Sequence, residues 1–474
     1  MSSTICAVAT PSGGALGIVR VSGPQAIEAT AAIFQGMGGK ALSEKRGGTL
    51  SFGRIVDPQN GETVDEVLVS LFHAPHSYTG EDSTEISCHG SGYILHRVVE
   101  LLLAQGCETA RPGEFTQRAF LNGKMDLSQA EAVADLIAST TAANHRMAMN
   151  QMRGHYSTML RELRDKLLHI TALMELELDF SDHEDLEFAD RSELLQLASD
   201  TLGRIDRLRQ SFRLGNALKR GVPVAIVGET NAGKSTLLNA LVGEERALVS
   251  DVHGTTRDTV EETVSLGDTL LRFIDTAGIR ATDDTVERMG IERTFSKIDE
   301  AELVLWLLDA TRWEAQWEAL APRIVPLCGE GKRLVVILNK TDRLPAAELP
   351  ALQAAVEQTL PAALQAHHKI FCPFCAQRAE SVSRLRTFLS GQLEAYKAGG
   401  GETDVVVSNL RHYEALTRAS ESLNRVIDGL HAQLSGDFVS QDLRETIHHL
   451  SDIIGEVTPD SVLHTIFREF CVGK

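Results

Sequence analysis

One stretch of the sequence, VAIVGETNAGKSTLLNA at residues 224–240, restricts the possible fold more than any other. Its first four residues form an apolar run typical of a buried strand, and an apolar helical stripe follows from Thr236 to Leu241. The eight residues between them, 228–235, have the spacing GxxxxGKS. A strand, a glycine-rich loop and a helix in this order predict a phosphate-binding loop within an α/β domain.

The residue types of this loop explain how it would hold phosphate. Gly228 and Gly233 let the backbone turn so that successive N–H groups point toward phosphate oxygens, and the next helix adds its positive N-terminal end. Lys234 supplies a point charge for the β- and γ-phosphates, and the Ser235 hydroxyl can ligate Mg²⁺. A plain turn before a helix is the alternative, and the complete motif argues against it.

Two further motifs follow predicted strands of the same domain. In DTAG at residues 275–278, the aspartate can hold Mg²⁺ through water and the glycine N–H can meet the γ-phosphate. In NKTD at residues 339–342, Asp342 can accept two hydrogen bonds from guanine, from N1–H and the 2-amino group. Adenine has neither donor, and at roughly 1.5–3 kcal/mol per bond the discrimination is on the order of 10²–10⁴. The motifs therefore predict GTP rather than ATP.

The segment SDVHGTTRD, residues 250–258, lies between the first two motifs. A threonine hydroxyl is expected there to complete the Mg²⁺ shell, and spacing alone does not choose between Thr255 and Thr256. Together these motifs resemble those of the translation-factor-like GTPases. The residue after DTAG is Ile279, whose apolar side chain cannot orient water. Hydrolysis therefore requires another group to place the water and another positive charge at the transition state.

The composition limits the class of protein. A chain of 474 residues is too long for one core and predicts about three domains. The net charge of −19 argues against a broad nucleic-acid footprint, although it leaves room for a local basic patch. Seven scattered cysteines do not indicate a disulfide framework, and no stretch approaches the ~20 apolar residues of a membrane span. Because the first ten residues lack a leader pattern, we expect a cytoplasmic protein with no membrane segment.

The order of apolar patterns predicts a multidomain α/β protein in which a doubly wound domain interrupts a helical bundle. Short strand-like runs separated by turns give the amino-terminal region an α+β pattern. The first helical region opens with a predicted capping box of Ser128 and Glu131. The expected domains are an amino-terminal domain at 1–122, a helical part at 123–215, a nucleotide domain at 216–395 and a second helical part at 396–474.

The pair Cys372 and Cys375 has the CxxC spacing of redox and zinc sites. The sequence offers neither a second such pair nor a histidine pair at finger spacing. The segment CAQRAESVSRL instead resembles a GTPase motif that lies beside the guanine. In that alignment Cys375 and Ala376, followed by Gln377, belong to the nucleotide site.

The whole chain resembles one family, the MnmE or TrmE family of tRNA-modification GTPases. Outside the nucleotide motifs the resemblance rests on ICAVATPSGGALGIVRVSG, SYTGEDSTEISCHG, ARPGEFTQRAFLNGKMDLSQAEAVADLI, NLRHYEAL and the terminal FCVGK. It implies an amino-terminal folate-binding and dimerising domain, a central helical domain and an inserted GTPase domain.

The resemblance also implies a site for a tetrahydrofolate derivative. In that family an arginine, a glutamate and a lysine bind folate, and they correspond here to Arg20, Glu85 and Lys124. The terminal Lys474 corresponds to a further contact. The family's carboxyl-terminal cysteine corresponds to Cys471, which is expected near the folate-derived carbon unit as a catalytic residue.

The family further implies that K⁺ supplies the extra positive charge and that two GTPase domains face each other. The implied K⁺ ligands are the Asn231 side chain, the Ser250 and Val252 carbonyls and the Thr255 hydroxyl. This choice assigns Thr256, together with Ser235, to Mg²⁺. Glu287 would orient the attacking water, so that Glu287 and Asn231 are the implied catalytic residues of hydrolysis.

Motifs and resemblance together predict one GTP site. Its expected residues are Asn231, Ala232, Gly233, Lys234, Ser235, Thr236, Ser250, Asp251, Val252, His253, Gly254, Thr255, Thr256, Asp275, Thr276, Ala277, Gly278, Asn339, Lys340, Thr341, Asp342, Cys375, Ala376 and Gln377.

The resemblance implies a homodimeric, K⁺-stimulated GTPase that acts with MnmG, a partner protein that uses flavin and NADH. The two proteins would install a carboxymethylaminomethyl-type group at C5 of the wobble uridine of certain tRNAs, using a tetrahydrofolate one-carbon unit. Two alternatives remain open. The first is a ribosome-assembly GTPase without modification chemistry, and the second is a zinc or redox protein that acts through the CxxC pair.

Overall fold

The computed structural model describes residues 3–38, 40–179, 191–243, 262–267, 269–274, 298–328, 332–359, 368–393, 405–468 and 470–473. The chain divides into two compact units. The first comprises Met1–Ile137, Met149–Ile205 and Ala415–Lys474, and the second comprises Ala138–Ala148 and Asp206–Glu414. Among the described helices, none is long and apolar enough to cross a membrane. The predicted extents of the four domains stay predictions.

The first unit contains a seven-stranded sheet in the order β3-β4-β5-β6-β2-β1-β7. All its pairings are antiparallel except β1 with β7. The strands are β1 (Ile5–Val8), β2 (Leu16–Ser22), β3 (Phe34–Gly36), β4 (Thr49–Val56), β5 (Thr63–Phe72), β6 (Ser83–His89) and β7 (Glu108–Thr109). The helical elements beside them are α1 (Ala26–Ile33), η1 (Leu42–Glu44) and α2 (Gly92–Ala104).

Alternation along the strands decides which face of this sheet is buried. Val19 and Val21 of β2 join the core formed with α1 and α2, while Arg20 between them lies on the opposite face. That opposite face carries three large apolar side chains, Leu50, Phe52 and Leu68, which are 68%, 48% and 43% exposed. Phe52 and Leu68 are directly paired across β4 and β5. The sheet therefore has one packed face and one partly apolar face exposed in the single chain.

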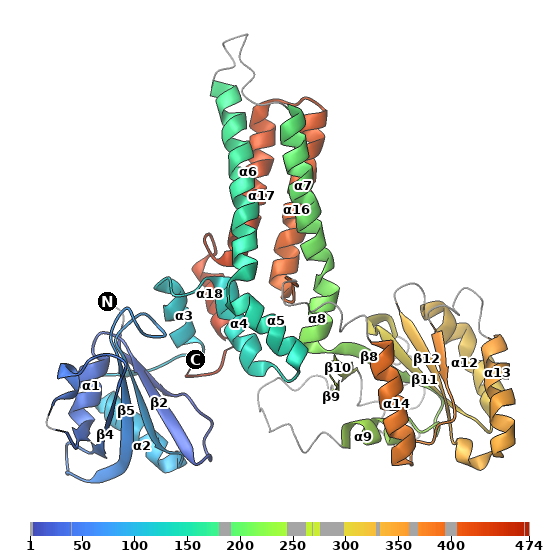
Figure 1. The fold of residues 1–474 in the computed structure, drawn as a ribbon, viewed down its shortest axis with the longest axis horizontal. Coiled ribbons are helices and arrows are strands. Elements are labelled where there is room, and N and C mark those ends of the chain that lie inside the picture. The colour runs from blue at the N-terminus through green and yellow to red at the C-terminus, as the bar shows by residue number, and fades with distance from the viewer. Residues whose placement is uncertain are drawn as a thin grey trace. The chain divides into compact units, whose positions relative to one another are not determined.

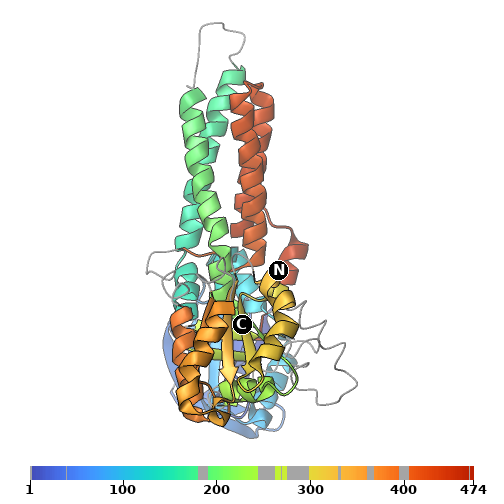
Figure 2. The same ribbon diagram turned by 90° about the vertical axis from the view of Figure 1, so that its right-hand side faces the viewer.

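Helices from before and after the nucleotide motifs form one bundle. Figures 1 and 2 show α6, α7, α16 and α17 side by side, and α6 packs against α17. The predicted insertion of the α/β domain into a helical bundle is therefore confirmed. The four bundle helices are α6 (His155–Asp179), α7 (Arg191–Gln210), α16 (Leu410–His431) and α17 (Gly436–Ile454). The shorter helices of the same regions are α3 (Glu114–Leu121), α4 (Leu127–Ala138), α5 (Ala142–Met152) and α18 (Asp460–Arg468).

The start of α4 corrects one prediction. Asp126 Oδ1 accepts the Gln129 N–H at 3.0 Å, and Gln129 Oε1 accepts the Asp126 N–H at 2.9 Å. These reciprocal bonds are the capping box, so the predicted pair of Ser128 and Glu131 is wrong. Ser128 lies inside the helix, where its hydroxyl donates to Asp126 Oδ1. The Asp126 carboxylate, two residues before Ser128, caps the helix, which begins at Leu127.

The second unit contains a six-stranded sheet in the order β13-β12-β11-β8-β10-β9. β9 runs antiparallel to β10, and the other pairings are parallel. The strands are β8 (Val222–Val227), β9 (Glu262–Leu266), β10 (Thr269–Phe273), β11 (Leu303–Asp309), β12 (Arg333–Asn339) and β13 (His368–Phe371). The helical elements are α8 (Phe212–Arg220), α9 (Lys234–Gly243), α12 (Trp313–Leu327), η2 (Thr341–Arg343), η3 (Ala346–Glu348), α13 (Leu349–Thr359) and α14 (Ala379–Gln392).

Helices cover both faces of this sheet, as the all-buried strand β11 requires. Leu305 packs in one core with residues of α9 and α14, and its neighbour Trp306 packs in another with residues of α12 and α13. The predicted doubly wound fold is therefore confirmed. In the parallel register Trp306 lies beside Val227 and Asp309 beside Asn339, so the loops after β8, β11 and β12 leave the same edge of the sheet.

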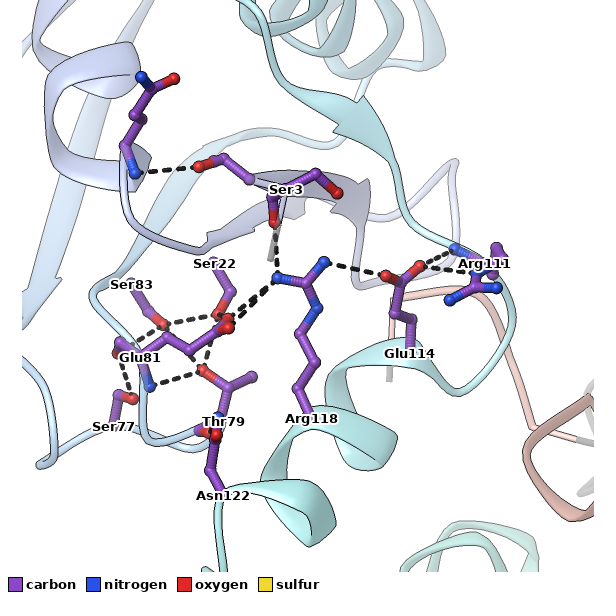
Figure 3. A network of polar contacts seen from close by, with 12 residues as sticks. Ser3, Ser22, Ser77, Thr79, Glu81, Ser83, Arg111, Glu114, Arg118 and Asn122 are labelled. Carbon is purple, nitrogen blue, oxygen red and sulfur yellow. Dashed lines mark hydrogen bonds and ion pairs between the residues drawn. The ribbon is translucent and has the colours of Figure 1, made fainter. Parts of the chain in front are cut away.

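A buried ion-pair network joins three segments of the first unit (Figure 3). Arg118 of α3 donates to Glu81 Oε2 at 3.1 Å, to Glu114 Oε1 at 2.9 Å and to the Ser3 carbonyl at 2.7 Å. Glu81 also accepts the Ser22 hydroxyl at 2.8 Å. Burial alone would raise the pKa of Glu114, but hydrogen bonds from Arg111 and Arg118 outweigh it and hold that pKa below its ordinary value.

Replacing Arg118 by Met keeps the side-chain bulk but leaves the carboxylates of Glu81 and Glu114 without their shared cation. We expect the local unfolding free energy to fall by about 3–5 kcal/mol at pH 7. The loss should shrink as the pH falls below the ordinary glutamate pKa of about 4.3, because Glu114, whose folded-state pKa is depressed, stabilises the fold only while it is ionised. Amide hydrogen exchange of peptides from β2 and α3 measures this local stability.

The control for this variant is Arg444→Met, which removes an ion pair with Glu175 whose side chains are 68% and 45% exposed. The expected loss there is below about 1 kcal/mol, because solvent screens exposed pairs. Equal losses of unfolding free energy for the two variants would show that the Arg118 network stabilises the fold no more than an exposed ion pair does.

Candidate functional site

The phosphate loop connects the end of β8 to the start of α9, as the sequence predicts. Gly228 and Gly233 have φ of +148° and +102°, in the region that favours glycine. A Cβ at Gly228 would lie 2.4 Å from the Leu307 carbonyl oxygen, and one at Gly233 would lie 2.3 Å from Asn339 Nδ2. Both glycines are therefore required by backbone conformation and by close packing.

The loop bends around the Lys234 ammonium group. Nζ donates to the carbonyls of Gly228 and Glu229 at 2.7 and 2.9 Å. Asn231 has a φ of +62°, a conformation that asparagine tolerates better than most residues, and it is exposed. Ser235 and Thr236 are also exposed, at the first turn of α9. The loop thus presents amide and hydroxyl oxygens outward and keeps its lysine inside the bend.

Asn339 joins the phosphate loop to the loop that follows β12. Its Nδ2 donates to the Ala232 carbonyl at 2.7 Å, and its Oδ1 accepts the Ala376 N–H at 3.0 Å. The side chain is 3% exposed, so both bonds are shielded from water. One buried amide therefore ties together the three loops that contain residues 228–235, 339–342 and 372–377.

The other residues of the NKTD motif follow the same arrangement. Lys340 has a φ of +61° and donates to Asp309 Oδ2 at 2.8 Å. The Thr341 hydroxyl donates to the Phe374 carbonyl at 2.9 Å, and Asp342 is exposed. The two anchored residues hold the loop, which leaves the Asp342 carboxylate accessible to a base.

The CxxC segment belongs to this loop cluster. Cys375 and Ala376 are buried, while Gln377 is exposed. Burial raises the pKa of the Cys372 thiol, although the charge of Arg384 opposes the shift. Both cysteines are free thiols, and no group of three or more possible metal ligands occurs among the described residues. Within the described residues, no third possible metal ligand is therefore grouped with this cysteine pair.

Several predicted site residues lie outside the described residues. Their predicted roles at the γ-phosphate, Mg²⁺, K⁺, water and folate sites therefore stay predictions. These residues are Ser250, Asp251, Val252, His253, Gly254, Thr255, Thr256, Asp275, Thr276, Ala277, Gly278, Glu287 and Lys474.

A second polar site surrounds Arg20 on the exposed face of the amino-terminal sheet. Arg20 Nη2 lies 2.9 Å from Glu85 Oε1 on the neighbouring strand β6. Its guanidinium carbon is 5.3 Å from the centre of the Tyr78 ring and 5.6 Å from that of Phe115, within cation–π range. Arg20 Nη1 also donates to the Gly473 carbonyl at 3.4 Å, so the carboxyl-terminal tail reaches this site.

The tail packs along the first unit at two further points. The Gly113 N–H donates to the Cys471 carbonyl at 3.4 Å, and Cys471 itself is exposed. Gly473 has a φ of +92°, and a Cβ there would lie 2.4 Å from the Val8 carbonyl oxygen. The close approach of Gly473 to β1 therefore allows no side chain at this position.

Lys124 contacts the segment that carries Tyr78. Its Nζ donates to the Pro75 carbonyl at 2.9 Å. A Cβ at Gly80 would lie 3.3 Å from Lys124 Cδ. The aliphatic part of the Lys124 side chain therefore packs on the loop that also carries Tyr78. Arg20 is thus in direct contact with Glu85 and with the tail. Lys124 instead contacts the loop that carries Tyr78.

The two rings beside Arg20 were missed by motif reasoning. Tyr78 and Phe115 occur within SYTGED and ARPGEFT, segments that gave no chemical signal of their own. The Tyr78 hydroxyl lies 2.9 Å from the Thr116 hydroxyl, and burial raises the pKa of Tyr78. An aromatic pair around a charged strand residue could be found only from the tertiary fold.

The chain matches two family models and several full-length relatives. The family model described as GTP-binding protein TrmE N-terminus matches residues 4–124, and that described as MnmE helical domain matches residues 127–471. The chain is 55% identical to the tRNA modification GTPase MnmE of Bacteroides thetaiotaomicron over 99% of both chains. It is 47% identical to that of Porphyromonas gingivalis, over 99% of this chain and 98% of the relative.

Among solved structures, the chain resembles the Era protein of Aquifex aeolicus bound to GDP and AlF₄⁻. The two are 27% identical, with a TM-score of 0.28 and coverage of 42% of this chain and 66% of that chain. The full-length relatives and the two family models confirm the resemblance predicted from the sequence. The chain belongs to the MnmE family of tRNA modification GTPases.

Proposed function

We propose that this protein is a K⁺-stimulated GTPase that, together with a flavoprotein partner, modifies C5 of the wobble uridine of certain tRNAs. One observation carries the proposal. A single chain combines a preassembled guanine-nucleotide loop cluster, joined through Asn339, with an Arg20 site that its own tail completes. The first feature suits a switch driven by GTP, and the second suits binding of a second, smaller substrate.

The guanine base would bind over the NKTD loop, and the phosphates would bind in the 228–235 loop. Asp342 is exposed where the two neighbouring motif residues are anchored, so its carboxylate can accept from guanine N1–H and the 2-amino group. The Lys234 ammonium would exchange its two carbonyl acceptors for phosphate oxygens. The buried Cys375 and Ala376 support the loop, and Gln377 lies beside it.

The oxygen donors exposed on the phosphate loop fit two cations. The Ser235 hydroxyl suits Mg²⁺, with Thr256 as the second protein ligand, and the Asn231 amide oxygen suits K⁺. The remaining proposed K⁺ ligands are Ser250, Val252 and Thr255. The K⁺ ion would supply the additional positive charge at the transition state, while Glu287 would orient the attacking water, which the apolar Ile279 cannot do.

A tetrahydrofolate derivative fits the charge pattern around Arg20. Arg20 and Lys124 are cations for an anionic cofactor, and the Glu85 carboxylate can accept from pteridine N–H groups. Lys474 would add a contact one residue beyond the Gly473 carbonyl that Arg20 binds. Cys471 is exposed beside α3, where its thiol is accessible to the one-carbon unit. The folate would supply that carbon unit, and these residues would bind and orient it.

We further propose that the protein acts as a homodimer in the cytoplasm. The exposed apolar side chains of Leu50, Phe52 and Leu68 lie on one face of the amino-terminal sheet, which supports pairing with a second copy. The proposed flavin- and NADH-using partner is MnmG, and the polynucleotide substrate is tRNA.

Nucleoside mass analysis of tRNA from a strain lacking this gene tests the proposed reaction. We expect the modified wobble uridine to disappear and to return when the gene is restored. Unchanged wobble uridine would contradict the modification chemistry and favour a GTPase switch in ribosome assembly.

Hydrolysis rates in K⁺ and in Na⁺ test the proposed cation. We expect GTP turnover to be at least about tenfold faster in K⁺, because an added positive charge stabilises the transition state. Asn231→Ser shortens the proposed K⁺ ligand and should abolish that difference. Asn239→Ser, at an exposed position on α9, is the matched control and should keep it. A full K⁺ response in the Asn231 variant would show that the cation assignment is wrong.

A further inference from the structure

Gln316 of α12 is almost completely buried, although it lies on a helix at the surface of the second unit. Its side chain is 2% exposed, and both ends of its amide form hydrogen bonds. Oε1 accepts the backbone N–H of Asp309 at 2.7 Å, and Nε2 donates to Glu229 Oε2 at 3.0 Å. Because a backbone N–H needs an acceptor and a carboxylate needs a donor, the amide orientation is fixed by its partners.

Glu229 connects this helix to the phosphate loop. It directly follows Gly228, and its own carbonyl oxygen accepts the Lys234 ammonium at 2.9 Å. Lys234 therefore holds the loop backbone, and the Gln316 amide holds the Glu229 side chain of the same loop. A half-buried carboxylate at this position is stabilised by a donor and destabilised by its loss.

Asp309 connects the same helix to the guanine loop. It is the last residue of β11, and its carboxylate accepts the Lys340 ammonium at 2.8 Å and the Thr311 hydroxyl at 2.7 Å. Burial alone would raise the pKa of Asp309, but the hydrogen bonds from Lys340 and Thr311 outweigh it and keep that pKa below its ordinary value. The carboxylate therefore stays ionised and holds Lys340 in place.

Aromatic packing mounts α12 firmly at this point. Trp317, the neighbour of Gln316, stacks on Trp306 of β11 with ring centres 4.8 Å apart and ring planes inclined by 18°. Movement of Gln316 away from Asp309 would disrupt this stack. The helix thus fixes the amide relative to the strand from which Asp309 projects.

We propose that Gln316 is a positioning residue that couples the phosphate loop to the guanine loop and sets the lifetime of the bound guanine nucleotide. The coupling runs from Glu229 through Gln316 and Asp309 to Lys340. It is separate from the Asn339 bond to Ala232, which joins the same two loops at another point. Loosening the chain of contacts releases both loops, so the nucleotide dissociates faster.

The inference rests on the guanine-nucleotide binding proposed above, and an exchange of the two partners tests it. Gln316→Glu sets a second carboxylate against Glu229 and breaks the contact. The double variant Glu229→Gln with Gln316→Glu restores it, because the new amide at position 229 donates to the new carboxylate at position 316. That carboxylate still accepts the Asp309 N–H. Stopped-flow release of N-methylanthraniloyl-GDP from the full-length protein gives the dissociation rate, and thermal unfolding monitors the fold.

We expect Gln316→Glu to release this GDP analogue about tenfold faster, as the loss of one charge-assisted hydrogen bond predicts. The double variant should return to within about threefold of the unchanged protein. The KM for GTP should rise in the single variant while kcat changes by less than about twofold, because no group at the reacting phosphate is altered. Glu318→Gln, an exposed change on the same helix, is the control.

Glu229→Ala provides a second test if Gln316→Glu does not fold, because it shortens a half-buried loop residue and should also accelerate release. The inference is overturned if the broken-contact variant releases the analogue at the Glu318→Gln rate, or if the double variant stays as fast as the single one. Failure of the unchanged protein to bind the analogue at all would overturn the proposed GTP binding as well.

Discussion

The buried amide of Asn339 is the interaction on which the nucleotide site depends. It donates to the phosphate loop at Ala232 and accepts from Ala376, while its own backbone ends strand β12. The site can be assembled this way because parallel strands deliver their loops to one edge of the sheet, with Asp309 beside Asn339 in register. Gly233 lacks a side chain at the point where the Asn339 amide approaches. The parallel sheet, the glycine at position 233 and the contact made by the Asn339 amide therefore depend on one another.

A second constraint ties the ends of the chain together. Arg20, near the amino terminus, binds the Gly473 carbonyl, and the tail also contacts Gly113 and β1. The Arg20 site therefore includes a residue of the tail that follows the last helices of the chain. The buried network of Arg118 beneath it holds the loop of residues 77–82 against α3, so the aromatic rings beside Arg20 are carried by two braced segments.

Most of the fold could be predicted because its signals are local. Apolar runs marked the buried strands, and the glycine spacing marked the phosphate loop before any contact was known. The cap of α4 was placed wrongly because Ser128 and Glu131 match the box spacing as well as Asp126 and Gln129 do, and only the observed bonds separate them. Gln316 and Tyr78 escaped prediction because their partners lie far away in sequence. The assignments of Arg20, Glu85 and Lys124 came from the family resemblance, since a lone charged residue on a strand gives no chemical signal.

The claim that the loop cluster recognises guanine through Asp342 is tested most directly by changing the base and the carboxylate together. Xanthine has a carbonyl in place of the guanine 2-amino group, and the amide of an Asp342→Asn variant can donate to it. Binding of GTP and of xanthosine triphosphate should be measured by calorimetry for the unchanged protein and this variant. The account predicts that the unchanged protein prefers GTP and that the variant loses about 100-fold in GTP affinity while gaining affinity for xanthosine triphosphate. Unaltered GTP affinity in the variant would contradict it.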